Sequence, residues 1–175
     1  EFDEVIIATG VVPRDPQIPG QDGANVLSYI DVLRHKVAVG KRAVVIGAGG
    51  IGFDVAEFLV EAGHSPTEDL NQWKTEWGIS DPETDRGGLA PAGPKPQAPT
   101  RDVVMLQRKA EKVGRRLGKT TGWIHRATLQ MKGVQMIAGV NYERIDSNGV
   151  HISFGPIRDN PQLIVADNII ICAGQ

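Results

Sequence analysis

The stretch Val44-Val45-Ile46-Gly47-Ala48-Gly49-Gly50-Ile51-Gly52 decides the fold of this chain. Three β-favouring residues lead directly into the spacing Gly-x-Gly-x-x-Gly, and an amphipathic segment follows. A strand, a tight glycine turn and a helix in that order open a dinucleotide-binding βαβ unit. The sequence therefore predicts a nucleotide site at this turn, and a purely structural glycine turn is the alternative.

Each glycine of the turn has a physical role in such a unit. Gly47 permits the sharp turn out of the strand, Gly49 lets a pyrophosphate approach the backbone, and Gly52 lets the helix pack close to the strand. The unpaired N–H groups and the positive end of the helix then face the phosphates. The candidate residues of this site are Gly47, Ala48, Gly49, Gly50, Ile51 and Gly52.

Length and composition are those of a globular domain with a sizeable core. A net charge of −2 over 175 residues does not suggest a nucleic acid or a membrane surface as the partner, and 5% aromatic residues argue against stacking on bases. No apolar run is long enough to span a membrane, and no signal peptide is evident. The one cysteine, Cys172, excludes an internal disulfide and fits a reducing compartment, so we expect a cytoplasmic location.

The order of apolar segments predicts an α/β fold: a Rossmann-like parallel sheet with an antiparallel β excursion. Strands of the parallel sheet are expected at 42–46, 102–107, 134–137 and 168–172, and antiparallel strands around 140–145, 150–154 and 163–165. Asn148-Gly149 is a strong hairpin signal within the excursion. Helices are expected from Ser28 to Gly40, over the segment after the glycine turn, from Thr67 to Trp77, and from Thr120 or Thr121 to Gly133.

The two ends of the chain resemble each other. Glu4 to Ala8 is predicted to be a short buried strand that ends in Ala8-Thr9-Gly10, and the last strand ends in Ala173-Gly174. The chain begins with Glu1 rather than Met and both ends lie within strand-like runs, so we expect a piece of a longer protein.

A long segment rich in Pro, Gly, Thr and Asp interrupts the nucleotide-binding unit. It runs over residues 64–101, where a simple unit would place its second strand within a few residues. We interpret it as an insertion at the rim of the sheet. Its part from Gly87 to Thr100 is expected to be among the least ordered of the chain, because it can bury little apolar surface.

A basic pair, Arg108-Lys109, comes directly after the second strand of the nucleotide-binding unit. An acidic residue there would accept hydrogen bonds from the adenosine ribose, whereas a basic pair suits a 2′-phosphate. We therefore expect NADPH rather than NADH, with Arg115, Arg116 and Lys119 adding a weaker, salt-sensitive positive field; a solvated basic face is the alternative. Between residues 101 and 132 the chain has nine Lys or Arg against two acidic residues.

Other signals carry less weight. Gly114 to Thr120 is one residue short of a P-loop and no strand leads into it, so we interpret it as an anion-friendly loop near the same nucleotide. The four histidines have no metal-ligand spacing, and Cys172 has no C-x-x-C partner, so neither a metal site nor a redox cysteine is expected. A methyltransferase that binds S-adenosylmethionine would require an acidic residue after the second strand, which Gln107-Arg108 contradicts.

Three blocks of sequence carry a resemblance to a known family. They are Val45-Ile-Gly-Ala-Gly-Gly-Ile-Gly-Phe-Asp54, Val104-Met-Leu-Gln-Arg-Lys109 and Leu117-Gly-Lys-Thr-Thr-Gly-Trp-Ile-His-Arg126. With the insertion and the Ile-Cys-Ala-Gly-Gln ending, the chain resembles the NAD(P)H domain of two-dinucleotide flavoprotein reductases over essentially its whole length. Within that superfamily it is most similar to the C-terminal part of bacterial NADPH-dependent 2,4-dienoyl-CoA reductases.

The resemblance implies an NAD(P)H domain inserted between two halves of an FAD domain. Residues 1–38 would be an FAD-domain stub and crossing segment, 39–167 the NADPH-binding domain with its insertion, and 168–175 the closing strand that returns to the FAD domain. Ala8, Thr9, Gly10, Ala173 and Gly174 would then be FAD-type turns, and Asp54 an orienting group near the nicotinamide.

In that family electrons pass from NADPH to FAD, through a 4Fe-4S cluster to FMN, and then to an unsaturated acyl-CoA. The chain lacks the cluster cysteines, the FMN barrel and the first FAD glycine motif. We therefore expect its partners to be NADP(H) and the rest of the same polypeptide, and we expect the isolated chain to carry no FAD and to be inactive. The NAD(P)H domain of a related NADH oxidase or amine dehydrogenase is the alternative, and a non-catalytic nucleotide-binding module is the alternative of another class.

Overall fold

The computed structural model describes residues 2–61, 63 and 65–174. Its helices are α1 (Tyr29–Leu33), α2 (Gly50–Val60), α3 (Leu70–Trp77) and α4 (Gly122–Met131). Its strands are β1 (Val26–Ser28), β2 (Arg42–Ile46), β3 (Asp102–Gln107), β4 (Gln135–Ala138), β5 (Val140–Asp146), β6 (Gly149–Phe154), β7 (Asp159–Val165) and β8 (Asn168–Ile171). Two short 3-10 turns lie at Pro66–Glu68 and Arg86–Gly88.

Five strands form a parallel sheet in the order β1-β8-β2-β3-β4. Ala43 to Ile46 of β2 are fully buried, as expected for a central strand covered on both faces. The expected strands at 42–46, 102–107, 134–137 and 168–172 all lie in this sheet, with the ends shifted by no more than one residue. The predicted Rossmann-like fold is therefore confirmed, and β1 is a strand that the sequence pattern did not reveal.

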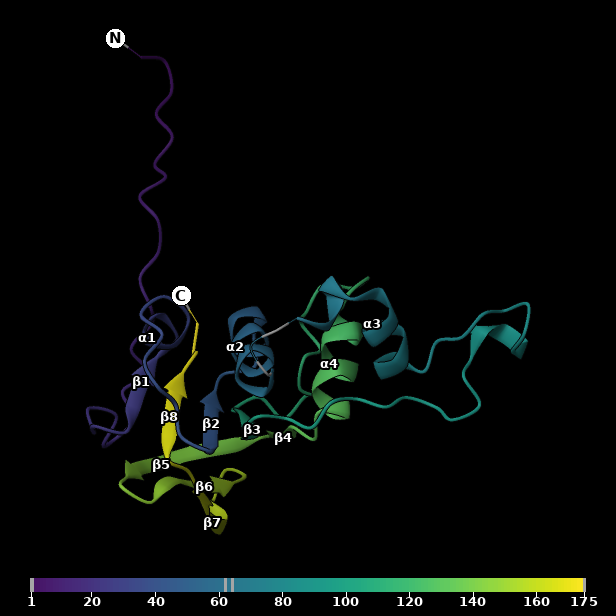
Figure 1. Cartoon of the computed structure of the whole chain (residues 1–175). Coiled ribbons are helices and arrows are strands. Elements are labelled where there is room, and N and C mark those ends of the chain that lie inside the picture. Colours follow the sequence, from purple (N-terminus) through teal and green to yellow (C-terminus); the bar gives the residue numbers. More distant parts are fainter. Residues whose placement is uncertain (1, 62, 64, 175) are drawn as a thin grey trace.

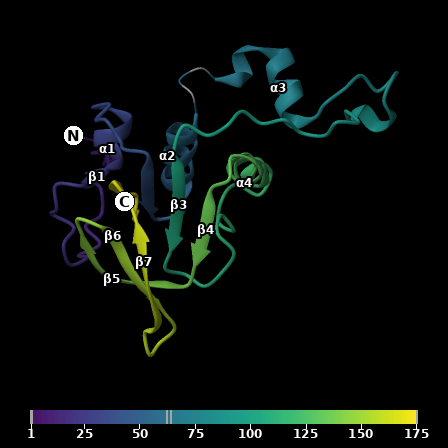
Figure 2. The ribbon, with the colours of Figure 1, turned by 60° about the horizontal axis from the view of Figure 1, so that its bottom comes forward.

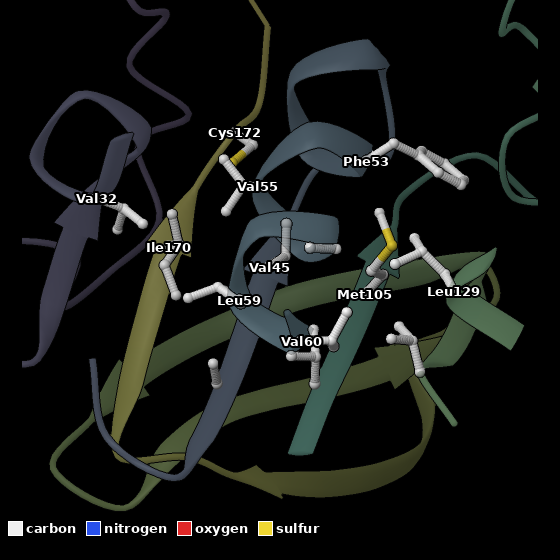
Figure 3. Close-up of a cluster of buried hydrophobic side chains, with 14 of the residues drawn as sticks. Val32, Val45, Phe53, Val55, Leu59, Val60, Met105, Leu129, Ile170 and Cys172 are labelled. Atoms are coloured by element: carbon white, nitrogen blue, oxygen red, sulfur yellow. The ribbon is translucent and has the colours of Figure 1, made fainter. Parts of the chain in front are cut away.

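Helices cover one face of the parallel sheet and an antiparallel sheet covers the other. On the helix side, Val45 of β2 and Met105 of β3 share a buried cluster with Phe53 and Leu59 of α2. Figure 3 shows Val45, Leu59 and Met105 between the helix and the strands, and the Phe53 ring extending from the side of the helix. On the other side, Val44 and its neighbours pack with residues of β5 and β6. Alternate residues of one strand thus enter two different cores.

The antiparallel excursion forms a three-stranded sheet of its own, in the order β5-β6-β7. A tight turn joins β5 to β6 where the sequence predicted a hairpin, but its two turn residues are Ser147 and Asn148, and Gly149 already begins β6. The third strand is longer than expected: it begins at Asp159 rather than near Leu163. Figure 2 shows this sheet beside the parallel strands.

Two details of the sequence-based assignment are wrong on the N-terminal side. Glu4 to Ala8 forms no strand, because no neighbouring strand offers it backbone partners. The helix expected from Ser28 to Gly40 ends at Leu33, although Ser28 and Asp31 do form the expected capping box; Lys36 has a φ of 54°, which a helix cannot accommodate. Figure 1 shows the N-terminal part of the segment before β1 running away from the body of the protein, whereas Ile18, nearer β1, is buried in the core.

The helix expected from Thr67 to Trp77 begins three residues later. Asp69 is its N-cap, and the Asp69 carboxylate accepts from the backbone N–H groups of Asn71 and Gln72 at 2.9 and 3.1 Å. The insertion that contains α3 projects beside α4 (Figure 1). A buried pair joins the two, with Lys132 Nζ 3.6 Å from Glu76 Oε2. The expected low order of residues 87–100 stays a prediction.

Candidate nucleotide-binding crevice

A cavity of about 610 Å³ opens at the carboxyl ends of β2, β3 and β8. The strand order runs from β2 through β3 to β4 on one side and through β8 to β1 on the other. The chain order of the sheet therefore reverses between β2 and β8, and ligands of open α/β sheets bind at such switch points. The cavity is lined by Arg14, Pro16, Gly47, Ala48, Gly49, Gly50, Ile51, Gln107, Arg108, Lys109, Glu111, Arg116, Tyr142, Cys172, Ala173 and Gly174.

The floor of this crevice consists of the turn Gly47–Gly52 and the segment Cys172–Gly174 after β8. Gly47 has a φ of 110°, and a Cβ on it would lie 2.4 Å from the carbonyl oxygen of Cys172. A Cβ on Gly52 would lie 1.9 Å from the carbonyl oxygen of Gly47. Both positions thus require glycine so that α2 and β8 can approach the turn.

Gly49 and Gly50 are glycines for a different reason. A Cβ on either would meet nothing within 4 Å, and both residues are exposed. Gly49 is the N-cap of α2 and has no side chain to satisfy the N–H groups of the first turn. The open space and the free donors together make this helix end suited to an anion such as a pyrophosphate.

The rim of the crevice is the loop Arg108–Arg116 that follows β3. The side-chain amide of Gln107 donates from Nε2 to the carbonyl oxygens of Lys109 and Glu111, at 2.8 and 2.7 Å. The end of β3 therefore fixes the backbone of the loop that carries the basic pair. Arg108 and Lys109 are both exposed and line the cavity, as expected for residues that would meet a charged ligand.

Tyr142 of β5 brings the antiparallel sheet into the crevice. Its hydroxyl donates to the carbonyl oxygen of Leu106 at 3.0 Å. Burial raises the pKa of this phenol well above its ordinary value, and the positive charge of Arg108 opposes that shift. The hydroxyl thus stays protonated and holds β5 against the end of β3.

Cys172 belongs to the floor, and its thiol is not set up for redox chemistry. The residue is 4% exposed, and burial raises the pKa of its thiol to about 12. A thiol without a nearby positive charge and with so high a pKa is a poor nucleophile at neutral pH. This agrees with the interpretation of Cys172 as a packed thiol.

The structure brings together nine of the residues predicted for cofactor binding: Gly47, Ala48, Gly49, Gly50, Ile51, Arg108, Lys109, Ala173 and Gly174. Gly52 lies beneath the turn and serves its packing. Asp54, Arg115 and Lys119 are exposed and do not line the cavity. Ala8, Thr9 and Gly10 lie in the extended segment before β1, away from the crevice.

The lining residues that were not predicted for cofactor binding are Arg14, Pro16, Gln107, Glu111, Tyr142 and Cys172. Arg116, expected only as part of a weaker positive field, lines the cavity itself. Glu111 belongs to the same loop as the basic pair, so its nearness in sequence could have suggested it. Arg14 and Tyr142 reach the crevice from distant parts of the chain, and no sequence spacing points to them.

A larger cavity, of about 810 Å³, lies at the opposite edge of the sheet, where Lys41 precedes β2 and Arg101 precedes β3. Its described lining lacks the Gly-x-Gly-x-x-Gly turn, and the Arg101 guanidinium donates to the carbonyl oxygens of Val39 and Leu59. Its size reflects an open groove beside α2, and the crevice at the carboxyl edge is the better candidate for a nucleotide.

Other classes of site find no support in the part of the chain that the structure describes. No group of three His, Cys, Asp or Glu side chains there is close enough to hold a metal ion. His125 packs between helices, with Nδ1 2.8 Å from Glu57 Oε1 on α2. No helix within the described ranges has the length and apolar character needed to cross a membrane.

Comparison with known proteins agrees with this geometry. The family model of the pyridine nucleotide-disulphide oxidoreductases matches residues 1–175. A metal reductase of Desulforamulus reducens is 27% identical over 174 residues, which are 99% of this chain and 24% of that protein. An NADH oxidase of Enterococcus faecalis is 38% identical over 71 residues, which are 38% of this chain and 16% of the oxidase.

Among solved structures, a 2-naphthoyl-CoA reductase in complex with 2-naphthoyl-CoA has the same fold. It superposes with a TM-score of 0.67 at 21% identity and covers 95% of this chain and 19% of that one. The chain thus spans no more than a quarter of the length of these relatives.

Proposed function

This chain belongs to the pyridine nucleotide-disulphide oxidoreductase family, and from that premise we propose that it is the domain that docks NADPH for hydride transfer to an FAD held by the rest of its polypeptide. The observation that carries the proposal is the crevice itself. It combines an open glycine turn at a helix N-terminus with a cation-lined rim at the switch point of the sheet. The bound nucleotide would supply the hydride, and the chain's own residues bind and orient it.

The floor and the rim would recognise different parts of the nucleotide. The turn Gly47–Gly52 offers backbone N–H groups to the pyrophosphate, which NADPH and NADH share. Arg108 and Lys109 would contact the 2′-phosphate, which NADPH alone carries. Ala173 and Gly174 lie at the end of β8, beside the turn, where the nicotinamide half would extend toward the flavin.

The residues present do not form an FAD site by themselves. Ala8, Thr9 and Gly10 are exposed, and a Cβ on Gly10 would meet nothing within 4 Å. Phe2, Val5, Ile6 and Ile7 are between 78 and 91% exposed, although their sequence is that of a buried strand. This mismatch supports the proposal that residues 1–14 pack against an FAD domain elsewhere in the polypeptide.

The proposed division of the chain follows from this. Residues 39–167 would form the NADPH-binding domain with an insertion at 64–101. Residues 168–175 would supply the closing strand β8, which pairs with β1 and β2, and then lead toward the FAD domain. Of residues 1–38, β1 pairs with β8 in the five-stranded sheet and α1 packs into the helix-side core through Val32, so the proposed FAD-domain stub proper is the extended segment before them. Asp54, Arg115 and Lys119 keep a secondary role in the proposal as charges near the crevice.

The acceptor proposed for the whole protein is a 2,4-dienoyl-CoA, reached through FMN and a 4Fe-4S cluster outside this chain, in the cytoplasm. The three sequence blocks that resemble the dienoyl-CoA reductases support it. An NADH oxidase is the second candidate, because one such protein shares 38% identity over 71 residues. The basic pair at the rim distinguishes the two candidates, since an enzyme that uses NADH has no 2′-phosphate for Arg108 and Lys109 to bind.

Replacement of both Arg108 and Lys109 by Ala tests the proposal. Two charge-assisted hydrogen bonds at an exposed site are worth about 3 kcal/mol, or roughly a hundredfold in affinity. Calorimetric titration should therefore show that loss for NADPH and almost none for NADH. An equal loss of affinity for both nucleotides would contradict the assignment of Arg108 and Lys109 to the 2′-phosphate. If the unaltered protein binds neither nucleotide, the proposed nucleotide site is wrong.

A further inference from the structure

Glu111 is the one carboxylate among the described residues that line the crevice. Its Oε1 accepts from Arg116 Nε at 2.6 Å. The side chain of Glu111 is 22% exposed and that of Arg116 is 67% exposed. The guanidinium therefore reaches out over the rim, while the carboxylate that holds it is mostly covered.

The fold fixes the position of this carboxylate. The Gln107 side chain holds the carbonyl oxygens of Lys109 and Glu111, and the backbone N–H of Gly139 donates to the same Lys109 carbonyl at 3.1 Å. The loop is thus fastened to the ends of β3 and β4 just where Glu111 begins. An Arg116 side chain tied to such a loop keeps a defined place at the crevice.

The chemistry of the pair bears on which nucleotide the site prefers. Arg116 uses Nε for Glu111, so the donors on its two terminal nitrogens stay available. Glu111 would otherwise be the kind of acidic group that accepts from the ribose 2′-OH of NADH and repels a 2′-phosphate. In the pair, the carboxylate is already occupied and its charge is neutralised.

We propose that the Glu111–Arg116 pair sets the nucleotide preference of the crevice. Glu111 is a positioning residue that holds Arg116 where its terminal nitrogens can bind a 2′-phosphate. Arg116 in turn masks a carboxylate that would favour NADH. This inference rests on the proposed function, because it requires NADPH in the crevice, and it adds an attractive and a repulsive element to the basic pair.

Arg115 provides a matched control for Arg116. The two arginines are adjacent, both are exposed, and both carry the same charge, but Arg115 does not line the cavity. A general positive field would make the two equivalent, whereas a contact at the rim makes Arg116 alone important.

The test is equilibrium titration of NADPH and NADH into the protein and its variants. Arg116→Ala should weaken NADPH by more than about tenfold, since a charge-assisted contact is lost and a carboxylate is unmasked. The same variant should bind NADH more tightly, by roughly twofold to threefold, because the freed carboxylate can accept from the 2′-OH. Arg115→Ala should change both affinities by less than about twofold.

Glu111→Gln completes a double-mutant cycle. Alone, this substitution should weaken NADPH binding, because Arg116 loses the carboxylate that holds it in place. In the Arg116→Ala background it should instead recover part of the NADPH affinity and abolish the gain for NADH. Tighter NADPH binding by Glu111→Gln alone, or equal effects of the two arginine variants, would overturn the inference. If the unaltered protein binds neither nucleotide, it is the proposed function that fails.

Discussion

The floor and the rim line the same crevice, but the floor consists of backbone and the rim of side chains. The floor is made of backbone that is packed so closely that Gly47 and Gly52 admit no Cβ. The rim is made of long charged side chains that stand in solvent, and hydrogen bonds from Gln107 fix only its backbone. The floor should therefore recognise a ligand by shape and the rim by charge. Substitutions that add volume should affect the floor, whereas salt should affect the rim.

The largest expected effect concerns the thiol of the floor. With a pKa of about 12, the Cys172 thiol is ionised far less at pH 8 than an ordinary thiol of pKa ~8.5, by a factor of roughly a thousand. The reaction of this single cysteine with a disulfide reagent should be slower by about that factor in the native protein than in denaturant. Similar rates in the two states would mean that the floor is open to solvent.

The next effect tests the close packing of the turn. Gly52→Ala places a methyl group against the Gly47 carbonyl, and such overpacking costs up to about 3 kcal/mol of unfolding free energy. Gly50→Ala is the control, because its Cβ enters open space, and in a helix it should stabilise by up to about 1 kcal/mol. Chemical denaturation of the two variants measures both, and equal stabilities would contradict the described packing.

A smaller effect is expected where the antiparallel sheet meets the floor. Tyr142→Phe removes the hydroxyl that donates to Leu106 and leaves that carbonyl oxygen without this donor, at a cost of about 1 kcal/mol. Tyr29→Phe serves as the control. The Tyr29 hydroxyl makes no hydrogen bond in the described part of the chain, so the free energy of unfolding of the Tyr29→Phe variant should be unchanged. An unchanged free energy of unfolding for Tyr142→Phe would show that the hydrogen bond to Leu106 does not stabilise the contact between the two sheets.

The smallest effect belongs to the rim. Its cations are exposed, and salt screens exposed charges over a distance of about 10 Å at 0.1 M. Raising the salt concentration should therefore lower the affinity for NADPH by a factor of a few more than the affinity for NADH. The stability of the floor should not follow the same trend. If the affinities for NADPH and NADH fall by the same factor as the salt concentration rises, the rim does not distinguish the two nucleotides.

The sequence predicts the floor better than the rim, for a physical reason. Gly47 and Gly52 are dictated by local backbone geometry, and the Gly-x-Gly-x-x-Gly spacing that they form with Gly49 predicted the turn that the structure shows. The basic pair could be placed because the end of β3 was predicted correctly. Arg14 and Tyr142 could not, since they reach the crevice through the crossing segment and the second sheet, whose orientation no local pattern encodes.

The errors at the N-terminal side have the same origin. The apolar run from Glu4 to Ala8 has the composition of a strand, but a strand requires a partner, and no strand among the described residues pairs with it. β1 is only three residues long, and its pairing with β8 rather than its own sequence makes it a strand. Long-range pairing of this kind is invisible to periodicity.

One backbone hydrogen bond has a mechanical consequence. Arg14 N–H donates to the carbonyl oxygen of Gly174 at 3.1 Å, so the segments that lead into and out of the sheet run together beside the crevice. Two segments that leave a domain side by side can serve as a hinge, because a few residues in them can absorb the backbone change of a rotation. In the proposed arrangement this double attachment acts as the pin of a hinge. The mouth of the crevice then lies beside the axis, where a large swing of the domain displaces the nucleotide least.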